Sequence, residues 1–243
     1  MLKLGWFSTG TGSGSRNLLT HFQSKILDGS IDASIAFVFC NRDQREDTET
    51  DKFLDLVDSY HVPLETLSYR QFNRESLSKD SHLFLRANYD ARVIDLIHKY
   101  NVDLIVLAGY MLIVSRTLSN TYKMINLHPA LPDGPKGTWR QVIEHLIEDK
   151  TSETGTMVHL VTEDVDRGPC ISFSQCDLRD LWSQYDTGNW DCAQLFESIR
   201  QKQFLQEPML LAGTISRIAS DVKLIWILGS ILTIALPAHS LFV

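Results

Sequence analysis

The sequence has no run or cluster of basic residues. Its 23 Lys and Arg residues are outnumbered by 30 Asp and Glu residues, so the 243-residue chain carries a formal net charge of −7. Proteins that bind nucleic acid neutralise phosphates with lysine and arginine, and this chain offers no stripe of them. Nucleic acid is therefore not expected as a partner. A chain of this length can bury a full core of its own.

Cysteine is scarce, and no Cys-x-x-Cys pair occurs. The four cysteines are spread along the chain, which argues against a structural zinc site, and no metal is expected. The first residues, MLKLGWFSTGTGSGS, lack the apolar stretch of a secretory signal and run into glycines. We therefore expect a cytoplasmic protein with reduced thiols.

Short apolar segments alternate with helical patterns over the first 150 residues. Parallel strands need a crossover, usually a helix, so this order predicts an α/β fold with a mainly parallel twisted sheet flanked by helices, Rossmann-like. After residue 150 two strands follow each other too closely for a helix, which predicts an antiparallel extension in the C-terminal half. The expected strands are residues 2–7, 31–40, 62–67, 102–111, 123–128, 155–161 and 168–176, and the expected helices are 16–27, 51–60, 83–100 and 191–219.

The end of the chain, residues 224–243, contains no Asp, Glu, Lys or Arg. Its length approaches that of a membrane span, but Pro237, His239 and Ser240 interrupt its apolar character. We prefer a core or interface segment to a membrane anchor, and an apolar segment of this kind leaves a homodimer open. The predicted organisation is a domain of residues 1–223 followed by a hydrophobic tail, 224–243, of open role.

The segment STGTGSGS follows the first expected strand and opens a helix, a position where proteins bind phosphate. Glycines let backbone N–H groups approach an anion, and the helix N-terminus favours negative charge. The segment is neither a Walker loop nor a GxGxxG dinucleotide fingerprint. We expect it to bind a single phosphate, and the alternative is a turn that only caps the helix. The residues concerned are Gly12, Ser13, Gly14, Ser15, Arg16 and Asn17.

Asn126 and His128 lie at the end of an expected strand, in INLHPALPDGP. Side chains at i and i+2 of a strand point to the same side, and open α/β sheets place their sites at strand ends. A further acidic loop, which contains Asp164 and Asp166, lies between two later strands. A carboxylate there could hold and charge the histidine, while the amide donates to a developing oxyanion. The alternative is that the histidine has only a structural role and that the acidic loop is merely exposed to solvent.

An amide, a histidine and a carboxylate that lie together are suited to catalysing attack on a carbonyl carbon. No serine or cysteine occupies a G-x-S-x-G nucleophile elbow, so a covalent acyl-enzyme is not indicated. The attacking group would then come from a substrate.

Three segments carry a resemblance to a known family. LAGYM (107–111), INLHPAL (125–131) and GTMVHLVTEDVDRGP (155–169) resemble the folate-dependent formyltransferases in order and spacing. The resemblance covers residues 1 to about 220 and is nearest to the branch that formylates glycinamide ribonucleotide in purine biosynthesis. It implies 10-formyltetrahydrofolate as the cosubstrate that donates the formyl group, and it implies no metal.

The resemblance also implies roles for individual residues. Asn126, His128 and Asp166 match the family's catalytic residues: the substrate amine attacks the formyl carbon, Asn126 and a protonated His128 stabilise the oxyanion, and Asp166 orients His128 and relays protons. Arg86 matches an arginine that contacts the nucleotide substrate, and the Gly12–Asn17 loop takes the phosphate position. The residues that match the folate pocket are Met111, Leu112, Val114, Val161, Thr162 and Asp164.

Two departures from the family concern the formyl acceptor. The segment PDGPKGTWRQV after HPAL is shorter than the usual form and lacks its histidine. Gln203 stands where a glutamate commonly meets the substrate ribose. The acceptor is thus open between glycinamide ribonucleotide and another amine, such as an amino sugar nucleotide. Hydrolysis of formyltetrahydrofolate and a non-catalytic ligand-binding protein are further alternatives.

Overall fold

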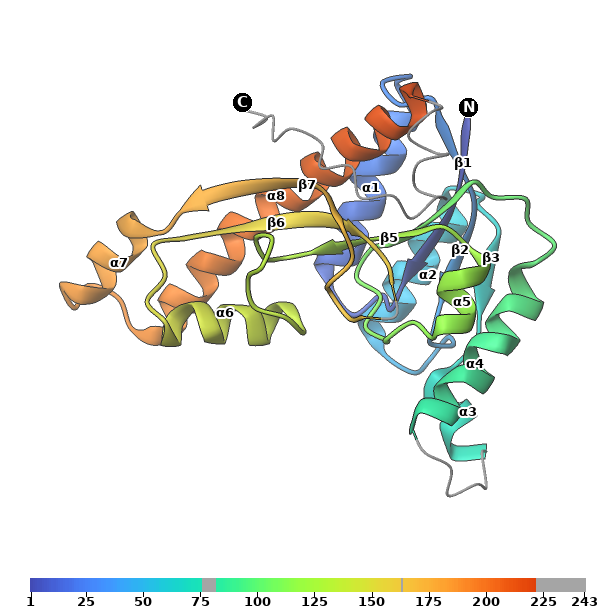
Figure 1. Ribbon diagram of the computed structural model, residues 1–243, viewed down its shortest axis with the longest axis horizontal. Coiled ribbons are helices and arrows are strands. Elements are labelled where there is room, and N and C mark those ends of the chain that lie inside the picture. The colour runs from blue at the N-terminus through green and yellow to red at the C-terminus, as the bar shows by residue number, and fades with distance from the viewer. Residues whose placement is uncertain (76–81, 163, 222–243) are drawn as a thin grey trace.

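The computed structural model describes residues 1–75, 82–162 and 164–221, which form a seven-stranded sheet flanked by helices (Figure 1). The strand order is β3-β2-β1-β4-β5-β6-β7. Strands β1 to β5 pair in parallel, whereas β6 and β7 are antiparallel additions beside β5. The expected fold class is confirmed, including the antiparallel extension. The predicted tail, 224–243, lies outside the described residues.

The strands coincide with the apolar segments of the sequence, but several are shorter than expected. Strand β4 ends at Leu107 rather than near Met111, because Gly109 has a φ of +72°, outside the β region. The strands are β1 (Leu2–Ser8), β2 (Ala33–Cys40), β3 (Leu64–Thr66), β4 (Leu104–Leu107), β5 (Met124–His128), β6 (Glu153–Leu160) and β7 (Cys170–Asp177).

The sequence predicts the four long helices and does not predict the shorter ones, α3, α5, α6 and α7. Two of these begin at capping residues: the Ser115 side chain accepts from Leu118 N, and Thr138 forms a capping box with Gln141. The helices are α1 (Ser13–Leu27), α2 (Thr48–Ser59), α3 (Tyr69–Glu75), α4 (His82–Ile97), α5 (Arg116–Thr121), α6 (Trp139–Glu148), α7 (Arg179–Asp186) and α8 (Cys192–Ser220). A search of the described residues finds no helix with the length and apolarity that a bilayer crossing requires.

Buried apolar side chains cover both faces of the parallel sheet. On one face α1, α2 and α8 pack against the strands, with Phe22 and Phe53 fully enclosed. On the other face α4 and α5 pack through Tyr89, Val93 and Leu118. A further cluster joins α6, α7 and α8 beneath the antiparallel extension (Figure 1). Burying one such side chain contributes roughly 1.5–3 kcal/mol, so each helix is held mainly by its apolar face.

The winding of the sheet reverses at β1. Strand β1 pairs with β2 on one side and with β4 on the other, and the helices that follow these strands cover opposite faces. In open α/β sheets ligands bind outside the carboxyl ends of the strands at such a reversal. The end of β5, with Asn126 and His128, lies two strands away at the same edge.

Gly155 provides a test of the antiparallel extension. A β-carbon at this position would lie 2.1 Å from the backbone oxygen of Ser174 on β7 and 2.6 Å from Leu131. We expect Gly155→Ala to lower the melting temperature, because forcing extra volume into a packed site costs about 1–3 kcal/mol. Gly213→Ala is the matched control: it faces open space in α8 and should stabilise by up to about 1 kcal/mol through helix propensity. Equal melting temperatures for the two variants would contradict the close β6–β7 contact.

Candidate active site

A cavity of about 700 Å³ lies at the carboxyl ends of the parallel strands. Its wall combines the N-terminal turn of α1, the segment after β4, the end of β5, the start of α6, the loop after β6 and one side of α8. A volume of this size suits one or two small molecules. The residues that the sequence groups as catalytic, Asn126, His128 and Asp166, all line it.

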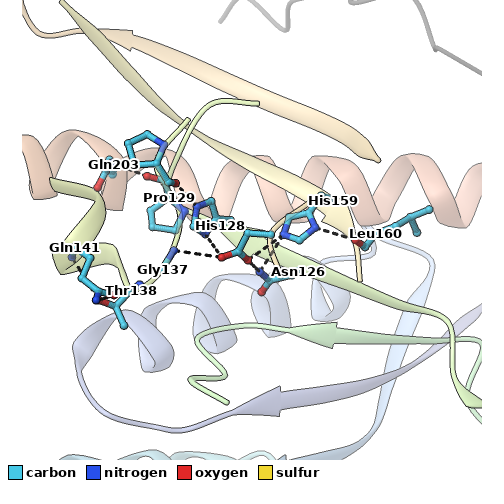
Figure 2. Close-up of polar contacts among 11 residues, drawn as sticks. Asn126, His128, Pro129, Gly137, Thr138, Gln141, His159, Leu160 and Gln203 are labelled. Carbon is cyan, nitrogen blue, oxygen red and sulfur yellow. Dashed lines mark hydrogen bonds and ion pairs between the residues drawn. The ribbon is translucent and has the colours of Figure 1, made fainter. Parts of the chain in front are cut away.

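The end of β5 holds two of these side chains beside a histidine of β6. In the antiparallel pairing Asn126 lies opposite His159, and His128 lies opposite Met157. Asn126 Nδ2 is 3.1 Å from His159 Nε2, and the two imidazole rings of His128 and His159 are 6.3 Å apart (Figure 2). Because residues two apart on a strand share a face, Asn126 and His128 both face the region that Asp166 occupies.

Asp166 comes from the loop after β6 and reaches both β5 residues. Its carboxylate accepts a hydrogen bond from Asn126 Nδ2 at 3.3 Å and lies 3.7 Å from His128 Nδ1. The backbone N–H of Gly137 donates to the same carboxylate at 3.4 Å. Asp166 has a φ of +52°, a left-handed conformation that costs a residue with a side chain on the order of 1 kcal/mol or more. The packing of the loop therefore holds Asp166 in a backbone geometry it would not adopt alone.

Asp166 is held in its charged form. Burial by itself would raise its pKa, but the neighbouring His128 imidazole and the Gly137 N–H oppose that effect, and the pKa of Asp166 lies below its usual value. A buried carboxylate is costly unless such donors surround it. At neutral pH the site therefore contains a fixed negative charge beside His128.

His128 is uncharged at neutral pH in this arrangement. Burial lowers the pKa of its imidazole, and Asp166 only partly opposes that effect. Its Nε2 is 2.9 Å from the carbonyl oxygen of Pro135, so this nitrogen carries a proton and donates it, and Nδ1 faces Asp166. The protonated His128 that the resemblance implies stays a prediction for the complex with substrate.

Four of the six residues predicted for the phosphate site line the cavity. Gly12, Ser13, Gly14 and Ser15 line the wall, and no side chain caps the first turn of α1, so its N–H groups face the cavity. Arg16 and Asn17 do not line it. The Arg16 guanidinium instead forms an ion pair with Glu49 of α2 at 2.7 Å. The assignment of Arg16 and Asn17 to the phosphate site stays a prediction, since neither residue lines the cavity in this arrangement.

All the residues that match the family's folate pocket line the cavity. They come from two segments, one after β4 and one after β6. Met111, Ile113 and Val165 expose 45%, 61% and 43% of their surface, which leaves an apolar rim at this end. The set is Met111, Leu112, Val114, Val161, Thr162 and Asp164.

Arg86 lies behind the cavity wall and does not line it. The side chain is 7% exposed and forms an ion pair with Asp90 at 2.7 Å. It donates hydrogen bonds to the carbonyl oxygen of Ile113 and, at 3.1 Å, to the Tyr110 hydroxyl, while Asp90 accepts from Ser115 N at 2.6 Å. The expected substrate contact of Arg86 stays a prediction, because in this arrangement the side chain makes its contacts within the protein. Its position fastens the segment after β4 to α4.

The α8 side of the cavity carries charges that the sequence analysis misses. Arg200 and Glu207 form an ion pair that lines the wall. The Arg200 guanidinium lies 5.1 Å from the ring of Trp139 and 5.4 Å from that of Phe204. A β-carbon on Gly14 would be 3.6 Å from an Arg200 nitrogen, so this cation borders the glycine loop. No sequence motif marks the pair.

Gln203, which replaces the family's glutamate, is fully buried and lies off the cavity. Its side-chain nitrogen donates to the carbonyl oxygen of Pro129 at 2.7 Å and to Thr154 Oγ1 at 3.1 Å. The α8 carboxylates that line the wall are those of Glu197 and Glu207. The position where the family commonly has a glutamate is thus buried off the cavity in this chain.

His159 is the other residue that the sequence analysis leaves unassigned. It appears in the segment that carries the resemblance, and its position opposite Asn126 could be found only from the strand register. Across the described residues, no set of three or more His, Cys, Asp or Glu side chains is arranged to hold a metal ion.

A doubly wound α/β sheet with Asn126, His128 and Asp166 gathered at the end of β5 defines an enzyme that acts on small molecules in the adjoining cavity. Comparison with known families gives the particular one: the family described as formyl transferase matches residues 6–181. The chain belongs to the formyl transferase family. It is a formyltransferase, an enzyme that transfers a one-carbon group.

Individual relatives show the same likeness. The chain is 28% identical to the phosphoribosylglycinamide formyltransferase of Bacillus subtilis over 174 residues, which cover 71% of this chain and 77% of that protein. It is 38% identical to the Escherichia coli enzyme of that name over 88 residues, 35% of this chain and 41% of that protein.

Solved structures share the fold at lower identity. The phosphoribosylglycinamide formyltransferase of Bacillus halodurans has a TM-score of 0.69 at 21% identity, covering 90% of this chain and 96% of its own. A formyltetrahydrofolate deformylase from Pseudomonas syringae has a TM-score of 0.63 at 19% identity. The match covers 90% of this chain and 62% of the deformylase chain. At sequence identities this low, the similarity shows only that the fold is shared.

The interaction of the Asp166 charge with His128 can be tested through the pKa of His128. Because the carboxylate raises the pKa of His128 against the effect of burial, Asp166→Asn should lower that pKa further. NMR titration of the His128 ring protons, identified by their loss in His128→Phe, measures the shift. Asp164→Asn, in the same loop, is the control and should leave the titration nearly unchanged. An unchanged or higher His128 pKa in Asp166→Asn would show that the two groups do not interact.

Proposed function

We propose that this formyltransferase transfers the formyl group of 10-formyltetrahydrofolate to a primary amine, in the cytoplasm, with glycinamide ribonucleotide of purine biosynthesis as the acceptor. One observation carries the proposal: Asn126, His128 and Asp166 meet at one cavity that is also lined by the residues expected to bind folate. The relatives described above carry the name of that reaction.

The proposed reaction is a direct transfer. The amine nitrogen of the acceptor attacks the formyl carbon, a carbon–nitrogen bond forms, and the bond to folate N10 breaks as a proton passes from the amine to that nitrogen. The negative oxygen of the tetrahedral intermediate lies near Asn126 and His128. Preorganised donors at such an oxygen stabilise it more than they stabilise the substrate carbonyl. The uncharged resting state of His128 fits this transfer, because its Nδ1 can take the proton that the amine releases and pass it on to N10. While it holds that proton, the imidazolium places a positive charge beside Asp166 and the oxyanion.

The folate end is assigned to the segment Met111–Val114 and the loop Val161–Asp166. The apolar rim of Met111, Ile113 and Val165 suits the flat pterin ring and the benzoyl group. This end lies beside Asn126 and Asp166, so a formyl group on N10 would reach the catalytic side chains.

The acceptor end is assigned to the first turn of α1, Gly12 to Ser15, which offers free N–H groups to a phosphate. A different amine, such as that of an amino sugar nucleotide, is the second candidate. It is favoured by the acceptor wall itself, where Arg200, Glu207 and Trp139 stand in the cavity and Gln203 is withdrawn into the core.

Kinetics of two variants test the chemistry. Removing one oxyanion donor typically costs about 100- to 1,000-fold in kcat, so Asn126→Ala and His128→Ala should each lose turnover on that order. Both should still bind a folate analogue, because the charge they stabilise exists only in the transition state. Formyl transfer from 10-formyltetrahydrofolate and folate titration are the two measurements. Near-normal turnover in both variants would place the reaction elsewhere.

The acceptor is tested with the unaltered protein. Thermal-shift and transfer assays with glycinamide ribonucleotide and with amino sugar nucleotides, each beside the folate donor, identify the amine that is consumed. Release of formate without any amine would indicate hydrolysis instead. Folate binding with no reaction under any of these conditions would favour a non-catalytic binding protein.

The phosphate position is tested at Gly12. A β-carbon there meets no atom within 4 Å, so a larger residue should leave the fold intact while it fills the approach to the α1 N–H groups. We expect Gly12→Val to raise the KM for a phosphorylated acceptor by roughly tenfold or more, the loss of about one charge-assisted hydrogen bond, with folate affinity unchanged. A fall in folate affinity instead would mean that the loop serves the donor.

A further inference from the structure

His159 is buried and uses both ring nitrogens within the protein. The side chain is 2% exposed, and Nδ1 lies 2.8 Å from the carbonyl oxygen of Leu160. Nε2 lies 3.1 Å from the side-chain nitrogen of Asn126 (Figure 2). The direct pairing of Asn126 with His159 across β5 and β6 sets this contact. The pairing of β6 with β7 shifts register between Val158 and His159, an irregularity of the kind that re-aims side chains beside active sites.

These contacts decide which nitrogen of His159 carries the proton. A carbonyl oxygen only accepts hydrogen bonds, so Nδ1 must be the N–H donor to Leu160. In the neutral ring Nε2 then has a lone pair and accepts from Asn126. The other neighbour of Nε2, Asp166 Oδ1, is 3.6 Å away, which is too long for a hydrogen bond.

The same reasoning fixes the orientation of the Asn126 amide. Nε2 of His159 and the carboxylate of Asp166 are both acceptors, and both lie beside one end of the amide, at 3.1 and 3.3 Å. Only the NH₂ end of Asn126 can satisfy two acceptors, and the reversed amide would place its oxygen against a negative charge. The Leu160 carbonyl thus sets the His159 tautomer, and the His159 tautomer sets the direction of Asn126.

We propose that His159 is a positioning residue for Asn126: it holds one amide hydrogen and keeps the NH₂ end turned toward Asp166, so that the other hydrogen is the one offered to the substrate oxygen. The proposal rests on the proposed function for its kinetic consequence. The amide orientation itself does not depend on it, and the two can fail separately.

The first experiment examines the folded protein without substrate. Nitrogen-15 shifts of the His159 ring, assigned by comparison with His159→Phe, report which nitrogen is protonated. We expect the Nδ1–H tautomer, and we expect the two Asn126 side-chain N–H signals to shift in His159→Phe. A ring protonated at Nε2, or Asn126 signals that do not respond, would overturn the positioning role whatever the protein's activity proves to be.

The second experiment compares three substitutions. His159→Phe keeps the ring and loses both hydrogen bonds, and it should lower kcat about tenfold, the value of roughly one hydrogen bond, with little change in the KM for folate. His159→Gln can still present an acceptor toward Asn126 and should recover much of kcat. His159→Asn can replace only the Nδ1 bond to Leu160 and should resemble His159→Phe. Melting temperatures of all three report any loss of stability separately.

A double variant separates positioning from a merely structural role. If His159 acts through Asn126, adding His159→Phe to Asn126→Ala should slow turnover no further. Multiplicative losses in the double variant, or His159→Gln no better than His159→Asn, would overturn the proposal. If the unaltered protein transfers no formyl group, the proposed function fails, and the nitrogen-15 result alone then decides the orientation of Asn126.

Discussion

The buried carboxylate of Asp166 joins the segments from which the site is built. It accepts from Asn126 on β5 and from the Gly137 N–H ahead of α6, and it faces His128, while its own backbone belongs to the loop after β6. A charge in this position is tolerable only if donors surround it. The left-handed backbone of Asp166 and the packing of the loop against β5 therefore depend on the same contacts that keep its pKa low.

The two histidines beside Asp166 have different environments and different uses. His128 is bound on one side by the Pro135 carbonyl and has its other nitrogen 3.7 Å from the carboxylate, which leaves room for a proton to arrive. His159 has both nitrogens occupied, one by Leu160 and one by Asn126. His159 is thus held by the protein through both ring nitrogens, and His128 is hydrogen-bonded through one. The two histidines lie on neighbouring antiparallel strands, and the register of β5 with β6 places them in these different environments.

The cavity is supported differently at its two ends. At the end lined by Met111, Ile113 and Val165, the buried ion pair of Arg86 and Asp90 holds the segment after β4 through Ile113 and Ser115. Removing one member of a buried pair leaves an uncompensated charge, so this support is costly to lose. At the other end the ion pair of Arg200 and Glu207 stands in the wall itself. The first pair shapes the site, and the second can meet a ligand.

The sequence by itself determined the sheet, its antiparallel extension and the placing of Asn126 and His128 on one strand end, because strand and helix periodicities are local properties of the chain. It also marked Asp166, through motif spacing. Tertiary structure alone decided that Arg16, Asn17 and Arg86 do not line the cavity, that Gln203 is buried off it, and that His159, Arg200 and Glu207 line it. Arg16 is held by Glu49 of α2, and Arg86 is bonded to the segment after β4. The positions of His159, Arg200 and Glu207 depend on how α8 packs against β6 and how β5 pairs with β6, contacts between segments far apart in the chain that no local pattern of residues encodes.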